Sequence, residues 1–166
     1  MNSTESVPYT FDSLLAKVEQ ICAWKDSLDN RLQSICDLLH RELDTYNWVG
    51  FYFVDSQNPE LVLGPYAGAK TDHVRIPFGR GICGQSAVSG ETFLVDDVSA
   101  EDNYIACSMD VKSEIVVPLY QGDLMVGQID IDSHTPAAFK KEDEVFLKAV
   151  NQKIAEILPV NYTFPS

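Results

Sequence analysis

The chain lacks any cluster of basic residues that would offset its acidic charge. Its 166 residues include 12 lysines and arginines against 25 aspartates and glutamates, giving a formal net charge of −13. Nucleic-acid binding depends on basic side chains that neutralise phosphates, so we expect no nucleic-acid partner. We also expect no membrane partner. The acidic surface disfavours anionic lipids, and no apolar run approaches the roughly 20 residues of a spanning helix.

Signals for export and for structural metal binding are missing as well. The first residues, MNSTESVPYT, contain no basic start followed by an apolar stretch, so we predict a cytoplasmic location, where thiols stay reduced. Cys22, Cys36, Cys83 and Cys107 form no C-x-x-C pair, which argues against a structural zinc site. A metal held by His73, Cys83 and Cys107 would lack any motif spacing, and we predict no metal.

The residues that are present indicate one ordinary globular domain, with 45% hydrophobic residues and 10% aromatic residues. Helical spacing of apolar residues covers 11–22, about 27–43 and 141–158, whereas strand patterns cover 47–55, 61–63, 92–95, 115–120 and 124–131. This order predicts an α+β domain over residues 1–166. We expect a mostly antiparallel sheet of about six strands flanked by the N- and C-terminal helices. Residues 1–9 and 160–166 are predicted to be loosely ordered tails.

Single residues add local expectations. Thr10 is suited to cap the first helix. Gly50 indicates either a bulge or the close approach of another group in its strand. Pro118 indicates an edge or irregular position, because proline cannot donate to a sheet ladder. Cys22 and Cys36 lie on or beside helical apolar stripes, so we predict that both are buried apolar residues.

The stretch from Ile76 to Asp132 concentrates the residues that could carry chemistry. Cys83 lies in the glycine-rich run GRGICGQSAVSG, which is either a turn that needs glycine or a helix start able to hold a carboxylate. Cys107 lies in a polar loop, and acidic residues stand at the ends of two predicted strands: Glu114, Asp130 and Asp132. A loop cysteine that faces carboxylates on rigid strands would suit thiol chemistry on a small cationic substrate.

Several motifs in this region resemble a known family. They are NWVGFY (47–52), LVLGPYAG (61–68), IPFGRGICGQSA (76–87), IAC (105–107), KSEIVVPL (112–119) and GQIDIDS (127–133). Together they make the chain similar to GAF domains and, within that superfamily, to the free methionine-(R)-sulfoxide reductases. The resemblance covers about half of the chain and implies a GAF-like fold.

The resemblance also assigns roles to residues. It matches Cys107 to the catalytic cysteine and Cys83 to a second cysteine in the glycine-rich turn. The residues matched to the cage around the free amino acid are Trp48, Tyr52, Glu114, Asp130 and Asp132. The sequence departs from the family at three places: His73 replaces a third, resolving cysteine; Asp102, Asn103 and Tyr104 replace proline, glycine and histidine; and Ser108 replaces an acid after the nucleophile.

These assignments imply reduction of free methionine-(R)-sulfoxide. Cys107 would attack the sulfur, and Glu114 or one of the aspartates would donate a proton. The resulting sulfenic acid would be resolved by Cys83 or directly by an external thiol such as thioredoxin or glutathione, with no other cofactor. A GAF-type module that binds an amino acid without turnover is the alternative. The sequence leaves monomer and homodimer open.

Overall fold

The computed structural model describes residues 10–101 and 110–162. In chain order the elements are α1 (Phe11–Cys22), α2 (Leu28–Glu42), β1 (Trp48–Val54), β2 (Glu60–Ala67), β3 (Arg75–Pro77), α3 (Gly81–Ser89), β4 (Phe93–Val95), a 3-10 turn (Val98–Ala100), β5 (Ser113–Gln121), β6 (Leu124–Ser133) and α4 (Lys141–Ile157). The six strands form one sheet in the order β3-β2-β1-β6-β5-β4, with every neighbouring pair antiparallel. The predicted α+β fold is confirmed.

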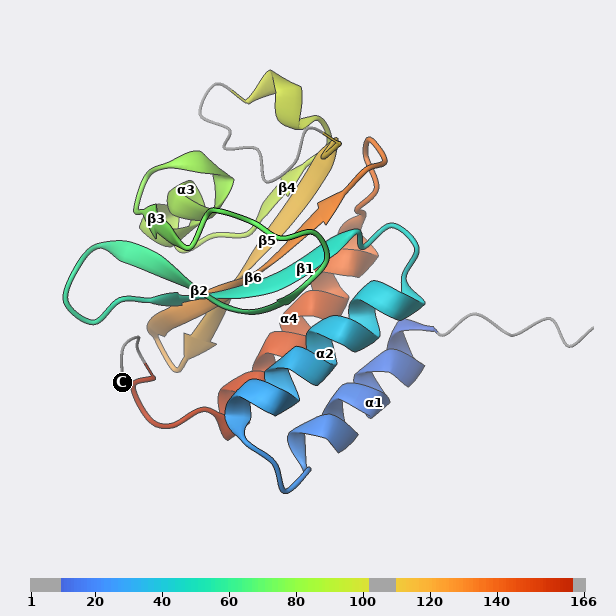
Figure 1. Cartoon of the computed structure of the whole chain (residues 1–166), viewed down its shortest axis with the longest axis vertical. Coiled ribbons are helices and arrows are strands. Elements are labelled where there is room, and N and C mark those ends of the chain that lie inside the picture. The colour runs from blue at the N-terminus through green and yellow to red at the C-terminus, as the bar shows by residue number, and fades with distance from the viewer. Residues whose placement is uncertain (1–9, 102–109, 163–166) are drawn as a thin grey trace, which may run out of the picture.

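Three helices form a layer on one face of the sheet (Figure 1). The hydroxyl of Thr10 accepts a hydrogen bond from the Ser13 amide at the start of α1, as predicted for a cap, and Ser27 does the same for the Asn30 amide in α2. Phe11 of α1 stacks on Phe146 of α4, with ring centroids 4.6 Å apart. Among the described helices, none is both long enough and apolar enough to cross a membrane.

Side chains alternate along the central strands, so that each strand contributes to two different clusters. On the helix side, Phe51 of β1 and Ile129 of β6 belong to the main hydrophobic core, to which α1, α2 and α4 contribute. On the opposite side, Tyr52 belongs to a second cluster that includes Ile82 and Cys83 of α3. Cys36 is fully buried in the main core and Cys22 is partly buried against it. The two faces therefore separate the structural core from the residues singled out for chemistry.

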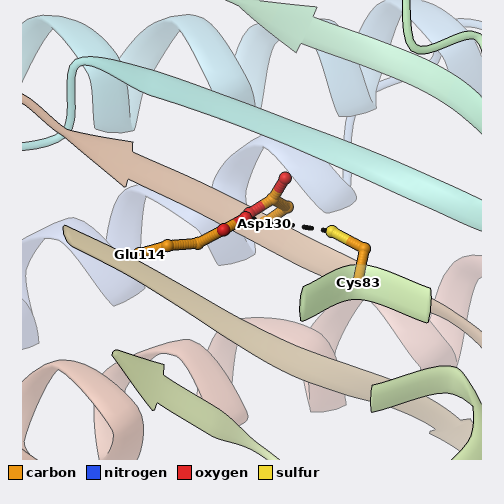
Figure 2. A group of neighbouring side chains, drawn as sticks. All are labelled: Cys83, Glu114 and Asp130. Atoms are coloured by element: carbon orange, nitrogen blue, oxygen red, sulfur yellow. Dashed lines mark hydrogen bonds between the residues drawn. The ribbon is translucent and has the colours of Figure 1, made fainter. Parts of the chain in front are cut away.

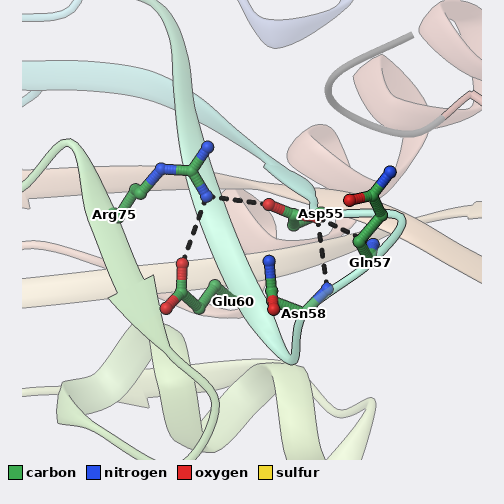
Figure 3. Close-up of polar contacts among 5 residues, drawn as sticks. All are labelled: Asp55, Gln57, Asn58, Glu60 and Arg75. Atoms are coloured by element: carbon green, nitrogen blue, oxygen red, sulfur yellow. Dashed lines mark hydrogen bonds and ion pairs between the residues drawn. The ribbon is translucent and has the colours of Figure 1, made fainter.

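A polar clamp fixes the hairpin of β1 and β2 to the short strand β3 (Figure 3). The guanidinium of Arg75 in β3 lies 2.7 Å from Asp55 Oδ2 and 3.1 Å from Glu60 Oε2. The other oxygen of Asp55 accepts hydrogen bonds from the amides of Gln57 and Asn58 in the turn. The hydrogen bond from Arg75 is the main cause that lowers the pKa of Asp55. Because β3 leads into the turn before α3, the clamp helps to set where Cys83 lies.

The short pairing of β4 with β5 explains why a proline is tolerated at position 118. Strand β4 pairs only with Glu114, Ile115 and Val116, so Pro118 lies beyond the end of β4, at an edge position as predicted. The Asn151 side chain in α4 donates to the carbonyls of Val117 and Pro118, at 3.1 and 3.0 Å.

The predicted tails fall mainly outside the described residues, which begin at 10 and end at 162. Tyr162 belongs to the predicted C-terminal tail, 160–166, and lies within the described residues. Its ring packs edge-on against Phe53, with the ring centroids 5.0 Å apart. Its amide donates to the Gln121 side chain. The described end of the chain therefore contacts both the sheet and the main core.

Candidate functional site

The five residues predicted to enclose an amino acid lie on one face of the sheet, opposite the helical layer. The backbone register places Asp132 of β6 opposite both Trp48 of β1 and Glu114 of β5, and Asp130 opposite Gly50. The side chains point to the same side because positions two apart on a strand share a face. All five are buried, with exposed fractions of 0–4%: Trp48, Tyr52, Glu114, Asp130 and Asp132.

A thiol and two carboxyl groups converge at the centre of this face (Figure 2). Cys83 projects from the first turn of α3, Glu114 from β5 and Asp130 from β6. The Cys83 thiol donates to Glu114 Oε2 at 3.9 Å, and one ligand atom from each of the three residues lies within 4.8 Å of the others. We call Cys83, Glu114 and Asp130 the thiol–carboxyl cluster.

Burial determines the protonation of this cluster. Burial raises the pKa of the Cys83 thiol well above its ordinary value, and the charges of Asp130, Glu114 and Asp132 raise it further. The start of α3 would favour a thiolate through its free amides, but here burial and the carboxylates outweigh it. Burial also raises the pKa of Asp130, although hydrogen bonding to Glu114 and Cys83 partly opposes the increase. At neutral pH, Cys83 is therefore a protonated thiol.

Aromatic side chains form the wall beside the cluster. The Trp48 ring stacks on Tyr66 of β2, with centroids 5.3 Å apart, and lies 6.4 Å from the Tyr52 ring. Trp48 Nε1 donates to the Ala69 carbonyl at 3.0 Å, and the Tyr52 hydroxyl donates to the His73 carbonyl at 3.1 Å. The two aromatic residues thus tie the 69–73 segment, between β2 and β3, to the sheet.

Gly50 leaves room for the Trp48 ring, so both of its predicted roles are found. The register of β1 with β2 shifts between Gly50 and Tyr52. A Cβ atom at position 50 would lie 2.3 Å from Trp48 Cη2 and 2.9 Å from Tyr66 Cβ. We expect Gly50→Ala to displace the indole and to cost about 1–3 kcal/mol of stability, as overpacking does.

The displacement can be measured by the fluorescence of Trp48 in a Trp24→Phe background, since these are the two tryptophans and Trp24 is half exposed. Gly122→Ala is the control. Its Cβ would meet nothing within 4 Å, but its φ of +60° makes alanine unfavourable there. That variant should lose stability without a change in Trp48 emission. Unchanged emission in Gly50→Ala as well would contradict the expected displacement.

Gln128 is a site residue that the sequence analysis missed. It is fully buried on β6, opposite Tyr52, and its Nε2 donates to the Cys83 carbonyl at 3.2 Å. Gln128 therefore fixes the backbone of α3 where the thiol projects. The run GQIDID contained the signal, because Gln128, Asp130 and Asp132 alternate along one strand.

The residues predicted to enclose an amino acid line two separate cavities. A cavity of about 20 Å³ has Tyr52, His73, Arg80, Cys83, Glu114 and Asp130 in its lining. A larger one, of about 340 Å³, is lined by Trp48 and Asp132 together with His40, Asn47, Gly68, Ala69, Val111 and His134. The predicted nucleophile, Cys107, lies outside the described residues. The structure thus brings Cys83 to the carboxyl groups and His73 to the same small cavity.

Comparison with known proteins agrees with the observed fold. The family model of the GAF domain matches residues 25–158. The free methionine-R-sulfoxide reductase of Escherichia coli is 35% identical over 95% of this chain and 92% of its own length. Protein YtsP of Bacillus subtilis is 40% identical over 73% of this chain and 74% of its own length. An X-ray structure of free methionine-R-sulfoxide reductase from Neisseria meningitidis, in complex with its substrate, has a TM-score of 0.83 and 36% identity, covering 89% of this chain and 87% of the other.

Proposed function

Because this chain belongs to the GAF domain family and is related to the free methionine-R-sulfoxide reductases, we propose that it reduces free L-methionine-(R)-sulfoxide with a cysteine thiol. The observation that carries the proposal is the thiol–carboxyl cluster beside the aromatic wall. The buried carboxylates would hold the ammonium group of a free amino acid, and the rings of Trp48 and Tyr52 would face its S-methyl group. A methionine inside a peptide has no such ammonium and should be excluded.

Residues of this chain can carry each step of the reduction, and an external dithiol supplies the electrons. The Cys107 thiolate attacks the sulfoxide sulfur, and the Glu114–Asp130 pair supplies the proton that the departing oxygen needs. The raised pKa of Asp130 favours its protonated form, which suits this role. Oxygen transfer leaves methionine and a Cys107 sulfenic acid. Attack by the Cys83 thiol then releases water and forms a disulfide, which an external dithiol reduces.

The first test of this function is a comparison of substrates. Thioredoxin-coupled oxidation of NADPH should proceed with free methionine-(R)-sulfoxide, and at least about 10²-fold more slowly with the (S)-epimer or a peptide-bound sulfoxide. A site built around a charged contact rejects molecules that cannot make it. Equal rates with the free and the peptide-bound sulfoxide would contradict the assigned ammonium role.

A GAF-type module that binds a free amino acid without turnover is the second candidate. Two observations favour it: His73 stands where the family usually has its resolving cysteine, and Cys83 is a buried, protonated thiol. Such a module would bind methionine or its sulfoxide through the same carboxylates. It would show calorimetric binding of the ligand and no NADPH oxidation.

A further inference from the structure

The thiol–carboxyl cluster has the composition of a metal site. A thiolate and two carboxylates would together carry three negative charges, and burying such charges is costly unless they are neutralised. The described residues in the lining of the cavity contribute one basic group of fixed charge, Arg80, at the N-cap of α3. A divalent cation would offset two of these three charges, and its bonds to the ligand atoms would be shorter than any hydrogen bond.

Asp130 provides an independent sign of an unfilled contact. Its side chain is 99% buried, yet Oδ1 has no hydrogen-bond partner among the described residues. The carboxyl group points toward Cys83 and Glu114 (Figure 2) and lines the same cavity. A buried carboxylate oxygen without a partner destabilises the folded state. An ion in the cavity would supply the missing contact.

We propose that Cys83, Glu114 and Asp130 form a binding site for a zinc ion. The ligand atoms lie within 4.8 Å of one another, and the sulfur lies 3.9 Å from Glu114 Oε2. Ligands of a tetrahedral zinc ion lie about 3.5 Å apart, given bonds of about 2.0–2.3 Å. A small inward movement of the side chains therefore completes the geometry. The thiolate selects zinc over magnesium and calcium, which prefer ligand sets made only of oxygen.

Three protein ligands leave the fourth position of the ion open, as in zinc sites that exchange ligands. Water can occupy it. On binding, the Cys83 thiol loses its proton to solvent and the sulfur bonds to zinc. If the proposed reductase function holds, zinc would occupy the carboxylates that hold the ammonium and block the thiol that resolves Cys107. Zinc would then be a reversible inhibitor.

Binding can be measured without any catalytic assay. The reduced chain should take up one zinc ion per chain in competition with a chromophoric chelator. Cys83→Ser and Asp130→Asn should each weaken binding by at least about 10-fold, the lower end of the loss seen even for groups behind a metal ligand. Cys36→Ser is the matched control. This buried cysteine lies in the main core, on the helix side of the sheet, and its replacement should leave the affinity unchanged.

Cobalt gives a second readout that does not require the Cys83 and Asp130 variants to fold. The wild-type chain loaded with Co²⁺ should show a thiolate-to-cobalt charge-transfer band, and Cys107→Ser should retain it. The proposal is overturned if wild-type protein binds no zinc, if Cys83→Ser binds it as tightly, or if Cys107→Ser removes the band. Zinc binding with the expected pattern but no sulfoxide reduction would remove the proposed function and leave this site standing. Sulfoxide reduction without zinc binding would support the proposed function and overturn the zinc site.

Discussion

Replacing Cys107 with serine should abolish even a single turnover of free methionine-(R)-sulfoxide, whereas replacing Cys83 should not. The first step needs only the nucleophile and a proton, and loss of a nucleophile commonly lowers a rate by at least about 10³-fold. Rapid quench of reduced enzyme with one equivalent of sulfoxide measures this step. Methionine should form in wild type and in Cys83→Ser, but not in Cys107→Ser.

Repeated turnover with thioredoxin separates the two possible ways of resolving Cys107. If Cys83 resolves the sulfenic acid, both variants should lose turnover, and Cys36→Ser should keep it. The raised pKa of Cys83 leaves little thiolate at pH 7, so a rate limited by resolution should rise with pH. Full thioredoxin-driven turnover in Cys83→Ser would instead mean that an external thiol attacks Cys107 directly. No methionine from wild-type enzyme in one turnover would leave the amino-acid-binding module as the function.

Glu114→Gln and Asp130→Asn should weaken binding of free methionine sulfoxide by about 2–5 kcal/mol, which corresponds to a roughly 30- to 5000-fold higher Kd. Each change removes one partner of a buried charged contact and leaves the other without its counter-charge. Calorimetry on variants that also carry Cys107→Ser measures the affinity without turnover. Unchanged affinity in both variants would show that the ammonium lies elsewhere.

Asp130→Asn should increase the stability of the fold although it weakens binding of the sulfoxide. The folded-state pKa of Asp130 is raised, so ionisation opposes folding, and stability falls as pH increases through that raised pKa. Asp130→Asn removes this effect and should add about 0.5–2 kcal/mol at neutral pH. Asp55 is the matched buried carboxylate, because its lowered pKa means that its ionised form stabilises the fold at neutral pH. Asp55→Asn should therefore destabilise the chain without changing the affinity.

The fold could be predicted from the sequence where a periodic pattern was long. Apolar residues at helical spacing located α1, α2 and α4, and alternation located the central strands. Strand β3 spans only Arg75–Pro77, which is too short for a pattern, and its position depends on the contacts of Arg75 with Asp55 and Glu60. Those partners lie on another hairpin, so local sequence could not indicate them.

The sequence indicated which residues could make up a site, but not the distances between them. Alternation along β6 implied that Asp130 and Asp132 share a face. Their separation into two cavities depends on where Trp48 packs. The sequence allowed a helix start at Cys83, which would favour a thiolate. Burial of the same thiol among carboxyl groups reverses that effect, and this burial depends on the packing of α3 against β5 and β6.

The hydrogen bond from Tyr52 to residue 73 uses the main-chain carbonyl, which every amino acid carries. Position 73 can therefore exchange one side chain for another during evolution while the connection to the sheet persists. A histidine and a cysteine at this position would present different chemistry to the same cavity from the same point of attachment. If the proposed reduction holds, the route by which the thiol is regenerated can thus differ between relatives while the proposed substrate-binding residues stay in place.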